Sequence, residues 1–251
     1  MATLKPTAPL PRLLRAIRPQ YYNHNHQQRR TFLPNPFSAL PNPPSSPQRL
    51  SATRTLPYPP APIYSIIADV PNYSTFLPYC QHSSVTKWSL PDARYGRRWP
   101  SEGLLTSGFG GITESFVSRI YCVPGRYVES VGGDAETTLN GDEIRHHVEG
   151  EDRAGQRSRD RRGNGLLTHL KSKWEVQGVQ VGSEARTRVS LTVEFSFANP
   201  MYAALSGGVA PKVAEYMVKA FEQRVQELLE RNPGMVKADL ADLDGSALRR
   251  K

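Results

Sequence analysis

The sequence has little cysteine and few of the patterns that mark an enzyme. Its two cysteines, Cys80 and Cys122, have no metal-site spacing, and we expect both to be free thiols. It contains no Gly-rich phosphate loop, no nucleophile elbow and no cluster of metal ligands. No apolar run approaches the roughly 18 residues that a membrane span needs. We therefore expect a protein that is not an enzyme and that uses no catalytic cofactor.

Acidic residues are missing from the beginning of the chain. The first is Asp69, and eight of the 32 basic residues precede it, which leaves 24 basic residues against 23 acidic ones. The formal net charge of +9 thus belongs to the first segment rather than to the remainder. A nearly neutral remainder argues against strong nucleic-acid binding.

The first segment has the pattern of an organelle import signal. In "LPRLLRAIRPQ" the leucines and the isoleucine fall on one helical face while three arginines face away. An acid-free amphipathic segment of this kind is typical of a mitochondrial transit peptide, which we place at residues 1–32, ending near "RRTF". Residues 33–49 are rich in Pro, Ser and Asn and are expected to form a disordered linker. The alternative is an ordinary disordered basic tail.

A single domain is expected over residues 50–231. A short strand at 51–58 precedes a helix that begins at the prolines near 60 and ends at Pro71. The pattern then alternates with period two, which predicts strands at 80–89, 102–109, 112–122, 126–132, 166–177 and 186–198. A long amphipathic helix follows, with its apolar stripe at Val209, Val213, Met217, Phe221, Val225 and Leu228. The predicted class is α+β: a curved antiparallel sheet wrapped around a C-terminal helix.

Two segments are expected to lie outside the packed domain. Residues 134–165 contain eight acids and six arginines with few apolar side chains, so we expect a flexible insertion there. A basic recognition loop at "RAGQRSRDRRG" is the alternative reading, weakened by the acids before it. Residues 232–251 are expected to form a solvated tail.

Four blocks of the sequence carry a family resemblance. They are "RTLPYPPAPIYSIIADVPNYSTFLPYC", "TSGFGGITESFVSRIYCVPGRYV", "THLKSKWEV" and "RTRVSLTVEFSFANPMYAALSGGVAPKVAEYMVKAFEQRV". Together they resemble the mitochondrial coenzyme Q-binding family of the START-like (polyketide cyclase/dehydrase) superfamily. Members tend to have Trp in place of Tyr79. The resemblance implies a helix-grip fold with an apolar tunnel that holds ubiquinone, and a carrier or chaperone role in respiration and coenzyme Q synthesis.

The ligand-binding residues are expected on the inner faces of these elements. Phe76, Leu77, Pro78 and Tyr79 stand where the first helix meets the sheet and are expected to close one end of the tunnel. Each apolar candidate is also an ordinary core residue by its pattern. The other tunnel candidates are Phe109, Phe116, Trp174, Phe195, Phe197, Met217 and Phe221, and a lid is expected at Met201, Tyr202 and Leu205.

Polar residues offer weaker signals. Glu114 is in phase with inward residues but is expected to meet solvent near a strand end, and His146 and His147 fall in the predicted flexible insertion. Lys171, Lys173, Arg186 and Arg188 are expected on solvent-facing sides of strands. They keep open the alternative of a mitoribosome- or protein-associated module without bound quinone. The resemblance implies peripheral contact with the matrix side of the mitochondrial inner membrane, and contact with coenzyme Q synthesis or respiratory complexes.

Overall fold

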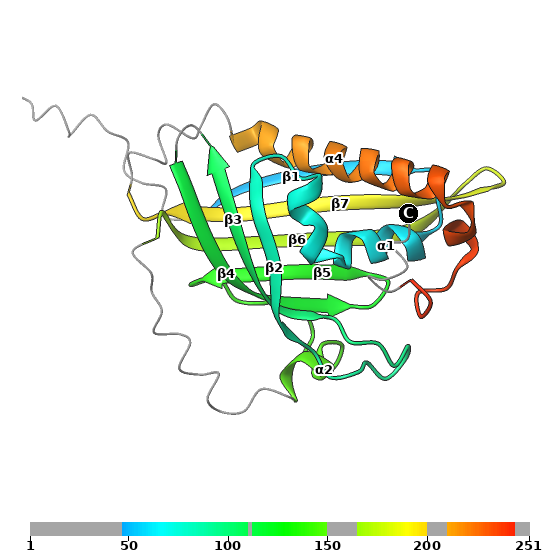
Figure 1. The fold of residues 1–251 in the computed structure, drawn as a ribbon, viewed down its shortest axis with the longest axis horizontal. Coiled ribbons are helices and arrows are strands. Elements are labelled where there is room, and N and C mark those ends of the chain that lie inside the picture. Colours follow the sequence, from blue (N-terminus) through cyan, green and yellow to red (C-terminus); the bar gives the residue numbers. More distant parts are fainter. Residues whose placement is uncertain (1–46, 110–111, 150–164, 200–209, 244–251) are drawn as a thin grey trace, which may run out of the picture. The chain divides into compact units, whose positions relative to one another are not determined.

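Seven antiparallel strands form one curved sheet (Figure 1). A computed structural model describes residues 47–109, 112–149, 165–199 and 210–243. The strands follow one another across the sheet from β2 to β7, and β1 lies beside β7 at the edge. Their bounds are β1 Gln48–Leu56, β2 Cys80–Trp88, β3 Pro100–Phe109, β4 Ile112–Val123, β5 Tyr127–Gly133, β6 Leu167–Val181 and β7 Glu184–Phe197. The predicted strands are confirmed. The period-two pattern identified them because one face of each strand is buried.

Two α-helices cover one face of this sheet, which we call the inner face. Helix α1 (Pro60–Ala68) follows β1, and helix α4 (Ala210–Arg231) packs against β1, β7 and α1. α1 starts with Pro at its first turn, where a missing N–H costs nothing. It ends at Ala68, and a 3₁₀ helix, η1 (Val70–Thr75), continues the chain, so Pro71 lies inside η1 rather than at the end of α1. The α+β fold with a C-terminal helix is as predicted.

The two faces of the sheet have different neighbours. Ile120 and Cys122 of β4 belong to the large core beneath the helices, whereas Tyr121 and Val123 belong to a second cluster on the outer face. Successive side chains of a strand point to opposite faces, which explains the division. Even-numbered positions of β4 therefore point to the inner face.

The outer face is covered by residues that were expected to be flexible. Ala135 and Ile144 are 2% and 3% exposed and pack on the outer cluster, and a short helix, α2 (Arg145–Val148), follows. The prediction of an unpacked insertion is wrong for residues 134–149, since few but well-placed apolar contacts hold the segment. Residues 150–164, which include the whole of the alternative basic loop, lie outside the described residues.

A buried ion pair fixes the same segment to the sheet. The Glu129 carboxylate, fully buried, accepts hydrogen bonds from the Thr137 hydroxyl at 2.5 Å and the Thr138 backbone N–H at 3.1 Å. The Lys171 ammonium lies 3.5 Å from this carboxylate and donates to the Glu136 carbonyl at 3.1 Å. Lys171 was expected on a solvent-facing side, which is wrong because its charge is paired within the protein.

His147 is a buried polar member of the covering segment. Its Nε2 accepts the Cys122 backbone N–H at 2.9 Å, so the proton resides on Nδ1, which donates to the Ser101 hydroxyl at 2.6 Å. Burial lowers the pKa of His147 to about 3, and the adjacent His146 acts in the same direction. The imidazole is thus neutral and structural, contrary to its predicted place in a mobile loop.

The chain after α4 also packs rather than forming a tail. A 3₁₀ helix, η3 (Pro233–Lys237), follows α4, and Met235, Leu240 and Leu243 are buried in the main core. The Arg97 guanidinium donates to the Leu240 carbonyl at 3.0 Å. The predicted solvated tail is therefore wrong for residues 232–243. Residues 244–251 lie outside the described part.

The buried stripe of α4 is rotated slightly from the predicted one. Phe221, Val225 and Leu228 are buried as expected, but Ala214 and Val218 fill the positions nearest the sheet. Met217 is only half-buried and flanks the stripe. Within the described ranges, no helix is long and apolar enough to span a membrane.

Candidate functional site

The residues between η1 and β2 form the corner predicted to touch a ligand. The Leu77 backbone N–H donates to the Tyr73 carbonyl at 2.8 Å, which closes the last turn of η1. Leu77 is buried at 6% exposure, while Phe76 and Pro78 are half-buried. Leu77 therefore lies in the main core, and Phe76 packs against it.

Tyr79 differs from the expectation. It is 39% exposed and so is not packed in the interior of the protein, and its predicted contact with a ligand stays a prediction. Its φ of 65° lies in the left-handed region, which a side chain with a Cβ rarely adopts. Its carbonyl accepts hydrogen bonds from the Gly108 backbone N–H at 2.9 Å and the Ser107 hydroxyl at 3.2 Å. These bonds to β3 hold the corner in its strained form.

Phe221 of α4 is the centre of an aromatic cluster on the inner face. Its ring centroid lies 4.4 Å from Trp174 of β6, 4.9 Å from Phe76 and 5.3 Å from Tyr73, with edge-to-face geometry in each pair. The cluster joins the corner, the sheet and the helix. Three of its members were predicted as site residues, and Tyr73 was missed. Its spacing of three from both Val70 and Phe76 was the available signal.

The remaining predicted residues lie farther along the same face. Phe195 is buried at 8% exposure and packs edge-to-face on the half-buried Phe197, with centroids 5.5 Å apart. Phe116 is half-buried and lies opposite Leu105 of β3. Phe109 ends β3, and its side chain is outside the described part. The predicted lid residues Met201, Tyr202 and Leu205 also lie outside the described residues.

Burial decreases along the inner face in one direction. In β4 the exposure rises from fully buried Cys122 through Ile120 at 3% to the half-buried Phe116. In β7 it rises from fully buried Leu191 through Phe195 to Phe197. The half-buried apolar side chains at this end, which we call the open end, are Phe76, Leu105, Phe116, Leu167, Leu170, Phe197 and Met217.

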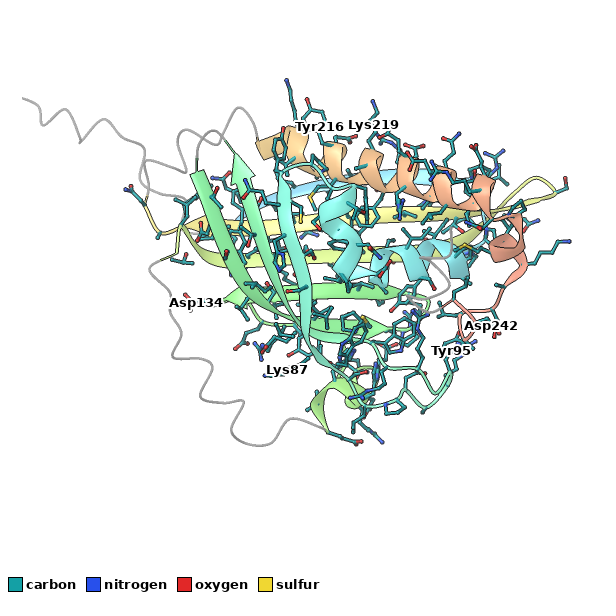
Figure 2. All side chains as sticks on the ribbon, in the orientation of Figure 1. Lys87, Tyr95, Asp134, Tyr216, Lys219 and Asp242 are labelled. Atoms are coloured by element: carbon teal, nitrogen blue, oxygen red, sulfur yellow. The ribbon has the colours of Figure 1, made fainter. Side chains whose placement is uncertain are left out.

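The opposite side of α4 has a different character. Tyr216 and Lys219 project away from the sheet, and Tyr216 is 46% exposed (Figure 2). This outer side of α4 is polar and solvated, whereas the side facing the sheet is apolar.

Glu114 is the polar residue at the open end. Its Oε1 accepts the Leu166 backbone N–H at 2.5 Å, and its Oε2 is buried without a hydrogen-bond partner among the described residues. The expectation that this carboxylate meets solvent is wrong. Its inward phase was the correct part of the sequence reasoning.

Burial favours the neutral form of both cysteine thiols. Burial raises the pKa of the Cys122 thiol to about 12 and raises that of Cys80 as well. Both cysteines are free, as predicted. Across the described ranges no group of three or more His, Cys, Asp or Glu side chains could hold a metal ion. At the open end the arrangement therefore offers apolar contact and the Oε2 acceptor of Glu114.

Comparison with known proteins agrees with this architecture. Residues 56–222 match the family model described as "Polyketide cyclase / dehydrase and lipid transport". The chain belongs to this family. The family's domain thus extends from the end of β1 into α4 and includes the corner, the aromatic cluster and the open end.

Individual relatives place the chain within the family. It is 30% identical over 175 residues to the mitochondrial coenzyme Q-binding protein of Schizosaccharomyces pombe, covering 70% of this chain and 85% of the relative. It is 26% identical over 173 residues to the ribosome association toxin of Pseudomonas aeruginosa, covering 69% and 92%. Its fold is similar to the Zhui aromatase/cyclase from Streptomyces, with a TM-score of 0.50 at 15% identity over 75% of this chain and 98% of that one.

Proposed function

We propose that the chain binds ubiquinone on the inner face of the sheet and acts as a carrier rather than an enzyme. The observation that supports this most is the open end, where the apolar core becomes half-buried beside the aromatic cluster. The S. pombe relative, at 30% identity, is named a mitochondrial coenzyme Q-binding protein. The family resemblance and the exposed apolar end agree on an extended, mostly hydrocarbon ligand.

The isoprenoid tail supplies most of the affinity in this proposal. Each buried CH₂ contributes about 0.8 kcal/mol, so a few isoprene units suffice for tight retention. The tail lies between the sheet and α4, against Phe76, Phe116 and Phe197, and displaces the flanking Met217. Methionine suits this place because its unbranched thioether adapts to an irregular neighbour. Trp174 and Phe221 form the floor on which the tail ends.

The cellular setting follows from the same relatives. Names that include "mitochondrial" support a mitochondrial location for this chain, with residues 1–32 as its import signal. We place it on the matrix side of the inner membrane, where its ligand resides, and infer that it delivers quinone to respiration and to late steps of coenzyme Q synthesis.

Co-purification tests the proposal. The full chain is purified without detergent and extracted with organic solvent, and quinone is measured by absorbance and mass spectrometry. We expect quinone at a sizeable fraction of the protein, lost in Phe76→Asp and retained in the matched control Tyr216→Asp on the outer side of α4. Thermal unfolding of each variant separates loss of ligand from loss of fold. A folded wild-type protein without quinone, which also fails to bind added quinone, refutes the carrier function.

A second candidate follows from the P. aeruginosa relative, which is named a ribosome association toxin and is covered to 92% by this chain. It requires a basic surface, because binding to RNA depends on phosphate contacts. Lys171 is buried in its pair with Glu129, which removes one charge from the predicted basic patch. Salt-sensitive co-sedimentation with mitoribosomes supports this candidate, and its absence at low salt removes it.

A further inference from the structure

Glu114 lies at the open end beside the corner. It occupies an even position of β4, on the inner face, and pairs directly with Ser107 of β3. Side chains of directly paired residues are roughly 5 Å apart at their Cβ atoms. The Ser107 hydroxyl donates to the carbonyl of Tyr79, so the strained corner and Glu114 are neighbours through one serine.

The strand pattern explains how this carboxylate comes to be buried. β5 ends at Gly133, and its pairing with β4 begins only at Arg119, so the first half of β4 lacks that neighbour. The Glu114 side chain reaches across toward the start of β6 and binds the Leu166 backbone N–H. Gly165 permits this approach, because an added Cβ there would lie 2.7 Å from Oε1. One oxygen is therefore held by backbone.

The second carboxylate oxygen of Glu114, Oε2, accepts no hydrogen bond from the described residues. Oε2 is buried and has no hydrogen-bond partner within the described ranges. Its inner-face neighbour two residues along β4 is Phe116, and the Ser107 hydroxyl already donates to Tyr79. A buried acceptor without a donor costs stability, and the cost is recovered when a ligand supplies the donor. An ionised carboxylate offers acceptors only.

We propose that Glu114 Oε2 accepts a hydrogen bond from a ubiquinol hydroxyl, so that the protein holds the reduced ligand in preference to the oxidised one. This inference rests on the proposed quinone binding. The two ligand forms share the same tail and methoxy groups and differ at the two ring oxygens. Ubiquinol presents O–H donors there, whereas ubiquinone presents only carbonyl acceptors, which an acceptor oxygen repels. The head group then lies at the open end, with the tail toward Trp174.

The test compares both redox forms with matched variants. Dissociation constants are measured anaerobically for ubiquinone with two isoprene units and for its quinol, using the full wild-type chain, Glu114→Gln and the control Glu175→Gln on the outer face. We expect wild type and the control to bind quinol about tenfold more tightly than quinone, since a hydrogen bond to a charged group is among the strong ones. Glu114→Gln replaces an acceptor with a donor and is expected to abolish the preference while keeping quinone affinity.

The outcomes separate the two ideas. Equal affinities in wild type, or a preference for quinone, overturn the role of Glu114 but leave quinone binding intact. A preference that survives Glu114→Gln in a folded protein also overturns it. If wild type binds neither form, the proposed function itself fails. Thermal unfolding of Glu114→Gln shows that the variant is folded, and Gly165→Ala, which crowds Oε1 without changing any charge, is expected to weaken the preference as an independent check.

Discussion

The neutral, buried His147 makes the stability of the protein depend on pH. In the folded state its pKa is lowered to about 3, against an ordinary value of 6.5. A depressed pKa contributes stability that is fully present above pH 6.5 and is lost as the pH falls toward 3. At pH 5 nearly every unfolded chain has protonated this histidine while the folded protein has not. The free energy of unfolding should therefore fall by about 2 kcal/mol between pH 7.5 and pH 5 through this residue alone.

Urea unfolding at pH 7.5, 6 and 5 measures this dependence. The variant His147→Gln keeps an acceptor for the Cys122 N–H but cannot titrate, so its stability should fall by about 2 kcal/mol less than that of wild type over the same range. Substitution of the exposed Val117 by Gln, which neither adds nor removes a titratable group, is the control and should leave the pH dependence of wild type unchanged. If His147→Gln loses as much stability as wild type between pH 7.5 and 5, the assignment of a buried neutral imidazole is refuted.

Three further predictions concern packing, charge and backbone strain. Phe221→Ala should lower the free energy of unfolding by about 3–5 kcal/mol, because three ring contacts are lost at once; a loss below about 1 kcal/mol in urea unfolding contradicts the central place of this ring. Lys171→Met should cost about 3–5 kcal/mol by leaving Glu129 buried and unpaired, and adding Glu129→Gln should recover much of the loss; additive effects in this double-mutant cycle contradict the pairing. Tyr79→Gly should be about 1 kcal/mol more stable than Tyr79→Ala and should melt at a higher temperature, because Ala keeps a Cβ at positive φ. Equal melting temperatures of the two variants mean that the corner stores no strain.

Local patterns predicted the sheet well because alternation depends only on neighbouring residues and one buried face. The strand predicted at 186–198 illustrates this, since every second side chain from Val189 to Phe197 is apolar and β7 ends within one residue of the prediction. Trp174 was found by the same alternation, Phe221 by the apolar stripe of a helix, and the corner by its place between the first helix and the sheet. Ligand contact at these residues stays a prediction.

The errors have a common cause in contacts between distant parts of the chain. Residues 134–149 contain few apolar side chains and were therefore expected not to pack. Their polar groups instead form hydrogen bonds with Glu129 and Lys171 of the sheet. Leu240 reads as part of a tail, but Arg97 binds its carbonyl. Glu114 was predicted to face solvent. Because β5 ends early, the Glu114 side chain instead reaches toward the start of β6 and binds the Leu166 N–H. None of these partners lies close enough in the sequence to be found from a local pattern.

The place of β1 beside β7 has a consequence for the order of folding. Thr53 and Ser190 form a hydrogen bond across this pair although 137 positions separate them in the chain. β2 to β7 can assemble hairpin by hairpin, whereas β1 must wait until β7 has been synthesised. Loop closure over so long a distance is slow compared with hairpin formation. Until then the edge of β7 is unpaired, and that interval is when the nascent protein most needs a chaperone.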